Sequence, residues 1–159
     1  MILVTIGTQD KKFPRLLEAV QKQIDRGVIK DEVIVQAGQT EFKSKNMKIF
    51  DFLPMDEFDK LIDKCDLLIT HAGVGSIIAG LKKNKKVIVA ARLHKYGEHE
   101  NDHQLQIAKS FDNSGYVLHL EDFDKLGDMI KNINKFKPKK FKSNTINFCN
   151  KLKEYIDNN

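Results

Sequence analysis

Residues 67–80 of this chain read Leu67-Leu68-Ile69-Thr70-His71-Ala72-Gly73-Val74-Gly75-Ser76-Ile77-Ile78-Ala79-Gly80. An apolar run of strand length stops at the polar His71, turns through small residues and continues with helical spacing. A strand that passes directly into a helix is the repeating unit of parallel α/β sheets. A helix that begins near Gly73 would aim unpaired N–H groups and the positive end of its dipole at the turn.

Two interpretations of this turn stay open. The small residues Gly73 and Gly75 would let backbone N–H groups approach a diphosphate, to which Ser76 would add a hydroxyl donor. They would equally allow close packing in a turn that binds nothing, because a lone Gly-x-Gly is a weak signal. His71 is likewise either a donor to phosphate or sugar oxygens, or a half-buried histidine bonded to a neighbouring carbonyl.

The same alternation extends along the chain in both directions. Short apolar runs rich in strand-forming residues lie at 2–6, 32–37, 47–52, 66–70, 86–90 and 115–120. Stretches with helical periodicity lie at 13–24, 55–63, 74–83, 102–110, 121–133 and 145–157. The pattern predicts an α/β protein with a Rossmann-like parallel sheet and helices on both faces.

A second turn of small residues follows the first apolar run. Gly7 and Thr8 combine a small residue with a hydroxyl, and the next helix begins a few residues later. In open α/β sheets, ligands bind beyond the carboxyl ends of the strands, which share one edge. We therefore expect both turns to face one crevice, although Thr8 and Asp10 would equally serve only as helix caps.

The third polar segment is a loop that follows a fully apolar strand. It reads Arg92-Leu93-His94-Lys95-Tyr96-Gly97-Glu98-His99-Glu100-Asn101-Asp102-His103-Gln104. Long polar loops in compact domains are often functional. Arg92 and its basic neighbours would suit phosphates, while Glu98 and Asp102 would accept bonds from ribose or sugar hydroxyls. Gln104 would donate and accept, but with Asn101 it also has the spacing of a capping box.

Several other kinds of site find no support in the sequence. His94, His99 and His103 cluster with carboxylates, but their spacing is not that of a dedicated metal site. Asp122-Phe123-Asp124 matches an Asp-x-Asp metal motif, yet it opens a predicted helix, so we interpret it as a cap. The chain has no phosphate-binding Gly-Lys-Ser/Thr loop, nucleophile elbow or paired-cysteine site. We expect neither a metal nor a cofactor.

The length and composition of the chain predict one globular domain. A chain of 159 residues has the size of one ordinary domain, and its 41% apolar and 31% charged residues suit a globular fold. We predict a domain at 1–133, with a basic linker and a C-terminal helix at 134–159 that packs on it. No apolar run reaches the roughly 20 residues that cross a bilayer, and Cys65 and Cys149 lack disulfide spacing. A cytoplasmic protein is therefore expected, with both cysteines as packing thiols.

The linker carries much of the basic excess, which totals +5 over the whole chain. Phenylalanines alternate with its lysines, which are Lys135, Lys137, Lys139, Lys140 and Lys142. Such a segment is either a solvated linker or a contact surface for anionic lipid headgroups or nucleic acid.

Three motifs in this order resemble one known family. They are Ile2-Leu3-Val4-Thr5-Ile6-Gly7-Thr8, then Thr70-His71-Ala72-Gly73-Val74-Gly75-Ser76, then Lys95-Tyr96-Gly97-Glu98-His99-x-x-Asp102-His103-Gln104. They resemble the C-terminal, nucleotide-sugar-binding half of family 28 glycosyltransferases in its free-standing form. The likeness is greatest to the PssE-like small subunit of bacterial capsule and exopolysaccharide transferases. More distantly, the chain resembles the small subunit of the split eukaryotic enzyme that adds the second N-acetylglucosamine to dolichol diphosphate.

The resemblance implies a GT-B architecture divided between two chains, of which this chain is the donor-binding half. Matching the motifs residue by residue, the implied donor-binding residues are Gly7, Thr8, His71, Ala72, Gly73, Val74, Gly75, Ser76, Glu98, Asp102, His103 and Gln104. Relatives often carry a glutamate for ribose three residues beyond the serine, where this chain has Ala79. Ribose must then be held in another way.

The implied activity is an inverting transfer of a hexose from a UDP-sugar to a lipid-linked saccharide, without a metal. The catalytic base would lie on a membrane-anchored, PssD-like acceptor-binding subunit, and the complex would act at the inner face of the membrane. An alternative is a non-catalytic module that binds a nucleotide-sugar or regulates a polysaccharide synthase. Nucleic acid is not an expected partner, because the chain has no recognised nucleic-acid-binding motif.

Overall fold

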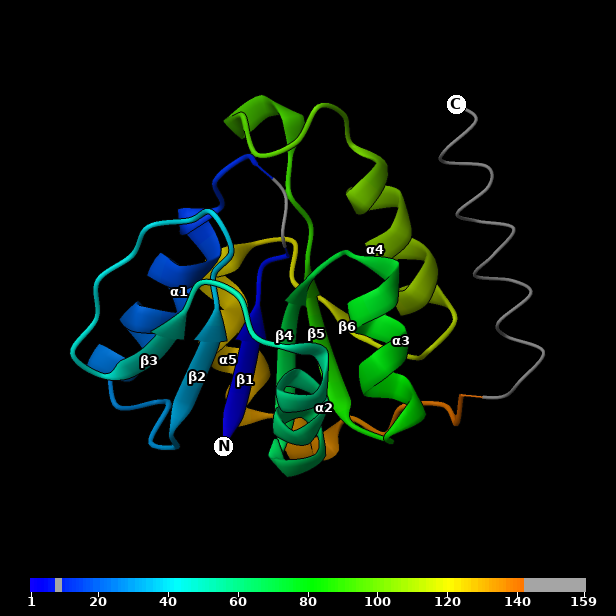
Figure 1. The fold of residues 1–159 in the computed structure, drawn as a ribbon. Coiled ribbons are helices and arrows are strands. Elements are labelled where there is room, and N and C mark those ends of the chain that lie inside the picture. Colours follow the sequence, from blue (N-terminus) through cyan, green and yellow to red (C-terminus); the bar gives the residue numbers. More distant parts are fainter. Residues whose placement is uncertain (8–9, 142–159) are drawn as a thin grey trace.

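The carboxyl ends of six parallel strands create the edge at which the predicted site should lie. The computed structural model describes residues 1–7 and 10–141. In these residues one sheet has the order β3-β2-β1-β4-β5-β6 (Figure 1). Its strands are β1 (Ile2–Thr5), β2 (Val33–Gln36), β3 (Met47–Phe50), β4 (Leu67–His71), β5 (Lys86–Ala90) and β6 (Leu118–His119). Each of the six predicted runs contains one strand, so the Rossmann-like sheet is confirmed.

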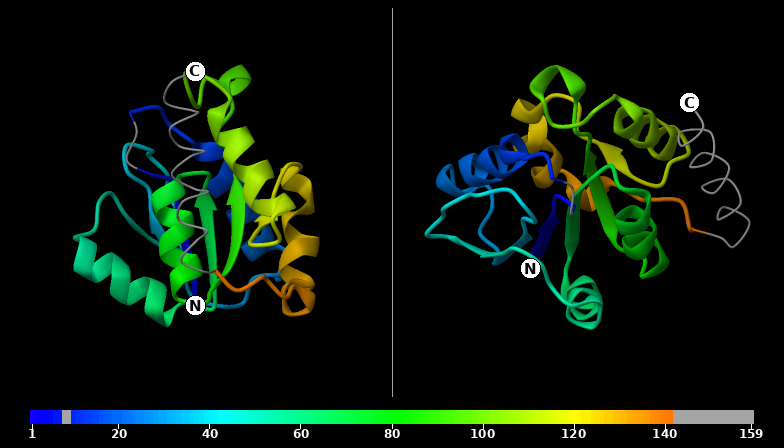
Figure 2. Two further views of the ribbon diagram at one scale, coloured as in Figure 1. Left: turned by 90° about the vertical axis from the view of Figure 1, so that its right-hand side faces the viewer. Right: turned by 45° about the horizontal axis from the view of Figure 1, so that its top comes forward.

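Helices cover both faces of the sheet, as predicted. They are α1 (Pro14–Asp25), α2 (Met55–Lys64), α3 (Val74–Lys82), α4 (His103–Asn113) and α5 (Leu126–Lys131). Shorter 3₁₀ segments are η1 (His94–Tyr96), η2 (Phe123–Lys125) and η3 (Ile133–Lys135). The helices α1 and α5 lie on one face, and α2, α3 and α4 lie on the other (Figure 2).

Two apolar layers hold this arrangement together. Successive side chains of a strand point to opposite faces, so Val4 and Ile69 pack toward α1 and α5. Leu3 and Leu68 pack toward α2, α3 and α4. Because both faces are covered, the central strands are apolar at nearly every position. Packing on both faces therefore holds the strands in place.

The strand order reverses between β1 and β4, which lie side by side in the sheet. They pair in parallel with Thr5 opposite Thr70. In sheets of this topology the chain leaves adjacent strands toward opposite faces, which opens a crevice at their carboxyl ends. The turns that follow β1 and β4 therefore meet at this crevice, as the sequence predicted.

Some local predictions are wrong. Asp10 does not cap α1, because Phe13 occupies the cap position and its N–H donates to Thr40 Oγ1 at 2.9 Å. The helix predicted over 121–133 is broken into η2 and α5, with η3 following. Within α5, Gly127 packs closely against Gln23 of α1, since a Cβ at Gly127 would lie 2.5 Å from Gln23 Oε1. Cys65 is a buried thiol, as expected.

Part of the predicted C-terminal segment can be followed. Residues up to 141 pack on the domain, where the Lys139 N–H donates to the Gly115 carbonyl at 2.9 Å and Phe141 contacts the Tyr116 ring. The helix predicted at 145–157, together with Lys142 and Cys149, lies outside the described residues. No helix within the described part of the chain is both long and apolar enough to cross a membrane.

Candidate functional site

The start of α3 presents backbone donors at the crevice. Gly73 is the N-cap residue, with φ −85° and ψ 124°, and no side chain in residues 1–7 or 10–141 caps the helix. The first helical N–H groups have no carbonyl one turn earlier to bond, and Ile77 is the first to bond back, to Gly73 O at 3.1 Å. The N–H groups of Val74, Gly75 and Ser76 are thus available to an anion, which the helix dipole also favours.

His71 brings the two glycine turns together. A Cβ built on Gly7 would lie 2.8 Å from His71 Cε1, and one built on Gly73 would lie 2.3 Å from the same atom. Real side chains do not approach so closely, so only glycine fits on either side of the imidazole. Gly7 also has φ +81°, which favours glycine. The imidazole therefore lies between the turn after β1 and the turn after β4.

The described residues of the predicted site all lie on segments that meet at this edge. Gly7 and residues 71–76 form the crevice itself, while Glu98, Asp102, His103 and Gln104 lie on the loop and helix that follow β5. Thr8, the remaining predicted residue, lies outside the described residues.

The imidazole of His71 is kept neutral. Its side chain is only 7% exposed, and burial together with the nearby Arg92 charge lowers the pKa of His71 to about 3. Its Nδ1 lies 3.3 Å from Gln104 Nε2. At neutral pH His71 therefore offers a hydrogen bond rather than a positive charge.

Gln104 does not complete the capping box suggested by its spacing from Asn101. Its side chain is 5% exposed, and its Oε1 accepts from the Arg92 N–H at 3.1 Å. Asn101 Oδ1 instead accepts from the His103 N–H at 3.0 Å, and Asp102 is the N-cap residue of α4. The capping-box interpretation is wrong because the Gln104 amide turns inward to the ends of β4 and β5.

Arg92 is not a free phosphate ligand. Its side chain is 1% exposed, and its guanidinium donates to the carbonyls of Ile6, Lys11 and Glu98. Burial lowers the pKa of Arg92 to about 10, an effect that the neighbouring Glu98 opposes. The side chain therefore ties the end of β1 to the loop after β5, and the expected phosphate contact is wrong for this residue.

Two buried polar atoms at this edge have no partner in the described part of the structure. They are Arg92 Nε and Thr70 Oγ1. Unpaired buried donors are costly and rare in folded proteins. Both atoms lie on residues at or just beyond strand ends, next to the crevice.

An ion pair holds the loop 92–104 against α1. Arg15 donates from Nε and Nη2 to the two oxygens of Glu98, at 3.0 and 2.9 Å. Its guanidinium also stacks on Phe123 and Tyr96, 3.8 and 4.5 Å from the ring centroids. Glu98, which is 3% exposed, further accepts from the Leu93 N–H at 3.0 Å. Its carboxylate is thus engaged by the chain, which indicates that it positions the loop.

The sequence analysis missed Arg15. A cation in the first turn of a helix is unfavourable for the dipole, and this was the one available signal that Arg15 has a tertiary partner. Its partner Glu98 follows 83 residues later, so no local pattern could reveal the pair.

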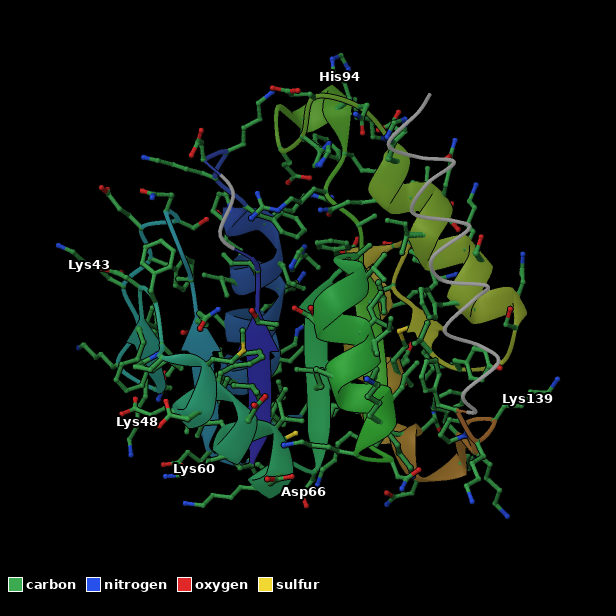
Figure 3. The ribbon with its side chains drawn as sticks, turned by 45° about the vertical axis from the view of Figure 1, so that its right-hand side comes forward. Lys43, Lys48, Lys60, Asp66, His94 and Lys139 are labelled. Atoms are coloured by element: carbon green, nitrogen blue, oxygen red, sulfur yellow. The ribbon has the colours of Figure 1, made fainter. Side chains whose placement is uncertain are left out.

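The remaining loop residues are more exposed. Asp102 Oδ1 accepts from the His94 N–H at 3.0 Å, and His103 is partly exposed at the first position of α4. A hollow of about 270 Å³ lies beneath this loop and is lined by Arg15, Leu93, Tyr96, Asp102, His119 and Glu121, among others. His94 marks the end of the molecule that carries the loop (Figure 3).

The described residues contain no group of three histidine, cysteine or acidic side chains that could hold a metal ion. Asp122 caps η2, where its Oδ1 accepts from the Asp124 N–H at 3.0 Å. The cap interpretation of the Asp-x-Asp motif is therefore confirmed.

The fold defines the class of protein. A doubly wound sheet of this order, with its crevice at the switch point, is the Rossmann-like architecture of the C-terminal half of GT-B glycosyltransferases. The chain belongs to the family described as the glycosyltransferase family 28 C-terminal domain, whose model matches residues 1–158.

Related proteins agree with this family. The chain is similar to the UDP-N-acetylglucosamine transferase subunit ALG13 of Candida glabrata, with 33% identity over 103 residues, or 64% of this chain and 48% of the relative. The human protein of the same name is 29% identical over 129 residues, which are 74% of this chain and 11% of the relative. The chain thus spans about half or less of the curated relatives it matches.

Solved structures share the fold. An NMR structure of ALG13 matches with a TM-score of 0.54 and 26% identity, covering 86% of this chain and 87% of that one. The glycosyltransferase SnogD of Streptomyces nogalater matches with a TM-score of 0.54 and 18% identity, covering 79% of this chain and 31% of that one. At 18% identity the second likeness concerns the fold alone.

Proposed function

We propose that this chain is the donor-binding subunit of a two-component inverting glycosyltransferase that takes a hexose from a UDP-sugar. The observation that carries the proposal is the contact of the His71 ring with both Gly7 and Gly73, beside the uncapped start of α3. The family and the names of its relatives, which are UDP-sugar transferase subunits, support the same conclusion.

The crevice suits a diphosphate for electrostatic reasons. The first turn of α3 offers unpaired N–H groups and the positive end of a helix dipole, and the neutral His71 adds a hydrogen-bond donor. Bulky side chains are absent, since Gly7 and Gly73 admit none. A ligand's phosphate oxygens would therefore reach the backbone directly.

Transfer would proceed by attack of an acceptor hydroxyl on the anomeric carbon of the sugar while UDP leaves. Negative charge then grows on the departing diphosphate, and the preorganised N–H donors of Val74, Gly75 and Ser76 stabilise it. These donors do what a metal ion does in metal-dependent enzymes, so we propose a metal-independent reaction. With a pKa of about 3, His71 is too weak a base for this step, so we propose that a base on another chain takes the proton of the acceptor hydroxyl.

Sugar and ribose contacts come from the neighbouring segments. His103 and Asp102 lie on the exposed side of the loop after β5, where we propose that they meet the donor sugar. Ala79 packs against the apolar layer under α3, and its side chain cannot form hydrogen bonds to the ribose hydroxyls. We therefore propose that other groups hold the ribose.

We further propose that the chain is PssE-like and pairs with a membrane-anchored, PssD-like subunit that binds a lipid-linked saccharide and supplies the base. The complex would act at the cytoplasmic face of the membrane in exopolysaccharide or capsule synthesis. In this proposal residues 1–133 form the donor domain, and residues 134–159 form a linker and helix that pack on it.

The proposal is tested by sugar transfer from a UDP-sugar to a lipid-linked acceptor, with the chain alone and with its membrane partner. Transfer is expected only with the partner, and it should persist in excess chelator. Loss of activity that Mg²⁺ restores would contradict the metal-free mechanism. Nucleotide binding without any transfer would instead indicate a non-catalytic or regulatory module.

The role of His71 needs a matched pair of variants. His71→Ala should weaken UDP binding, measured by calorimetry, because the crevice loses a donor. His94→Ala changes an exposed histidine on η1 and should leave UDP binding unchanged. Equal affinities for the two variants would remove His71 from the site.

A further inference from the structure

One side chain connects the crevice to the loop after β5. The Gln104 amide lies between the end of β4 and the residue that follows Ala91, with its oxygen on the Arg92 N–H at 3.1 Å. Its nitrogen lies 3.3 Å from His71 Nδ1. The side chain is buried, so no solvent competes for these contacts.

The hydrogen-bond pattern has one consistent assignment. A backbone N–H only donates, so the atom of the Gln104 amide that faces Arg92 must be the oxygen. The NH₂ group then faces His71 and donates, which requires that Nδ1 be unprotonated. The single proton of the neutral imidazole is therefore on Nε2.

His71 Nε2 lies beside both glycine turns. A Cβ added to Gly7 would lie 2.8 Å from Nε2, and a Cβ added to Gly73 would lie 2.7 Å from it. Gly73 is also the N-cap residue of α3. A proton on Nε2 therefore lies next to the turn from which α3 begins.

We infer that Gln104 is a positioning residue that holds His71 as the neutral Nε2–H tautomer, so that the imidazole donates into the crevice. This departs from the donor-binding role that the family resemblance implies for Gln104, because both of its polar atoms are already bound within the chain. The tautomer itself follows from the contacts within the chain. Only its use in binding a diphosphate rests on the proposed function.

The surroundings oppose any charged form of the ring. The charged and titratable groups near His71 are the Arg92 guanidinium and His99, and both disfavour a positive imidazole. On the loop, the buried acid Glu98 is paired with Arg15. A neutral amide is therefore the partner that leaves the proton on Nε2 without introducing charge.

The tautomer can be read directly. Long-range ¹H–¹⁵N correlation spectra of the ¹⁵N-histidine-labelled chain distinguish a protonated ring nitrogen from a bare one. With no nucleotide present, His71 should show a protonated Nε2 and a bare Nδ1 from pH 5 to 8. A protonated Nδ1 in this range would overturn the inference.

Two substitutions test the role of Gln104. Gln104→Met removes the donor and should give a mixture of the two tautomers. Gln104→Glu presents an ionised oxygen to Nδ1 and should move a proton onto that nitrogen. The control is Gln106→Glu, which makes the same change at an exposed position of α4 and should keep the wild-type spectrum. Unchanged Nε2–H spectra in both Gln104 variants would overturn the inference.

Binding separates this inference from the proposed function. UDP affinity, measured by calorimetry, should fall about tenfold in Gln104→Met, which corresponds to one lost hydrogen bond, while Gln106→Glu retains wild-type affinity. If the spectra are as expected but the wild-type chain does not bind UDP, the proposed function fails and the tautomer assignment stands. Wild-type affinity in a Gln104→Met variant with mixed tautomers would overturn the link to binding.

Discussion

The two edges of the sheet differ in whether their polar groups have hydrogen-bond partners. At the amino edge, Lys83 and Lys85 donate to the carbonyls of Asp59 and Asp63 in α2, at 2.9 and 2.8 Å. Lys86 donates to the Ile133 carbonyl at 3.0 Å. At the carboxyl edge, no side chain of the described residues caps the first N–H groups of α3, and Arg92 Nε and Thr70 Oγ1 are buried without a partner among these residues. Asp66 and His94 mark these two ends in Figure 3.

The two edges therefore differ in how the unpaired backbone groups of helix ends are satisfied. Helix ends leave unpaired backbone groups that must find partners. The lysines of the amino edge provide such partners within the chain. The start of α3 keeps its donors free although a capping side chain would have stabilised the helix, by about 1 kcal/mol.

The largest effect should follow from filling the crevice. In Gly73→Ala the new methyl group would lie 2.3 Å from His71 Cε1, and the buried ring has no room to move. We expect a loss of up to about 3 kcal/mol in the free energy of unfolding, measured in urea, and no detectable UDP binding.

The matched control is Gly75→Ala, whose Cβ would meet nothing within 4 Å. Alanine favours helix over glycine, so stability should stay equal or rise by up to about 1 kcal/mol. Similar destabilisation by both substitutions would contradict a specific need for glycine at Gly73, next to the His71 ring.

Breaking the Arg15–Glu98 pair should give the next largest effect. Arg15→Met leaves the buried Glu98 carboxylate without its two strongest donors, and we expect a loss of about 2 kcal/mol in unfolding free energy. Adding Glu98→Gln should recover part of this loss, because the double variant no longer buries an unpaired charge. Additive losses in this double-mutant cycle would contradict a coupled pair.

Acid should weaken the fold through His71. Its pKa is about 3 in the folded chain and 6.5 in the unfolded one, so below pH 6.5 only the unfolded state takes up the proton. Stability should therefore fall by about 1.4 kcal/mol per pH unit between pH 6.5 and 3 from this residue. The variant His71→Gln does not titrate, and its unfolding free energy should fall less steeply. Parallel curves would contradict a neutral buried His71.

The smallest effect is expected at the amino edge. Lys85→Gln removes a partly exposed contact to a helix carbonyl, and we expect a change below about 0.5 kcal/mol with UDP affinity unaltered. A marked loss of UDP binding would mean that the two edges are not independent.

Much of the fold could be predicted because its signals are local. The six apolar runs each contain a strand, since residues buried on both faces of a parallel sheet must be apolar. The sequence pattern over 121–133 did not show that this segment is divided between η2 and α5. The interpretation of Asp10 as the cap of α1 is also wrong. The cap residue is Phe13, and its N–H donates to Thr40 Oγ1, which is far away in the chain.

At the site, local patterns in the sequence identified the two turns that meet at one edge. A small residue after an apolar strand is a local pattern, and parallel strands bring their carboxyl ends to one edge, so Gly7 and residues 71–76 were identifiable. The partners of the polar side chains at this edge were visible only in the folded chain. Arg15 pairs with Glu98, Arg92 bonds to the carbonyl of Ile6, and Gln104 bonds to His71. Such partners depend on distances that packing sets, and spacing along the chain carries no record of them.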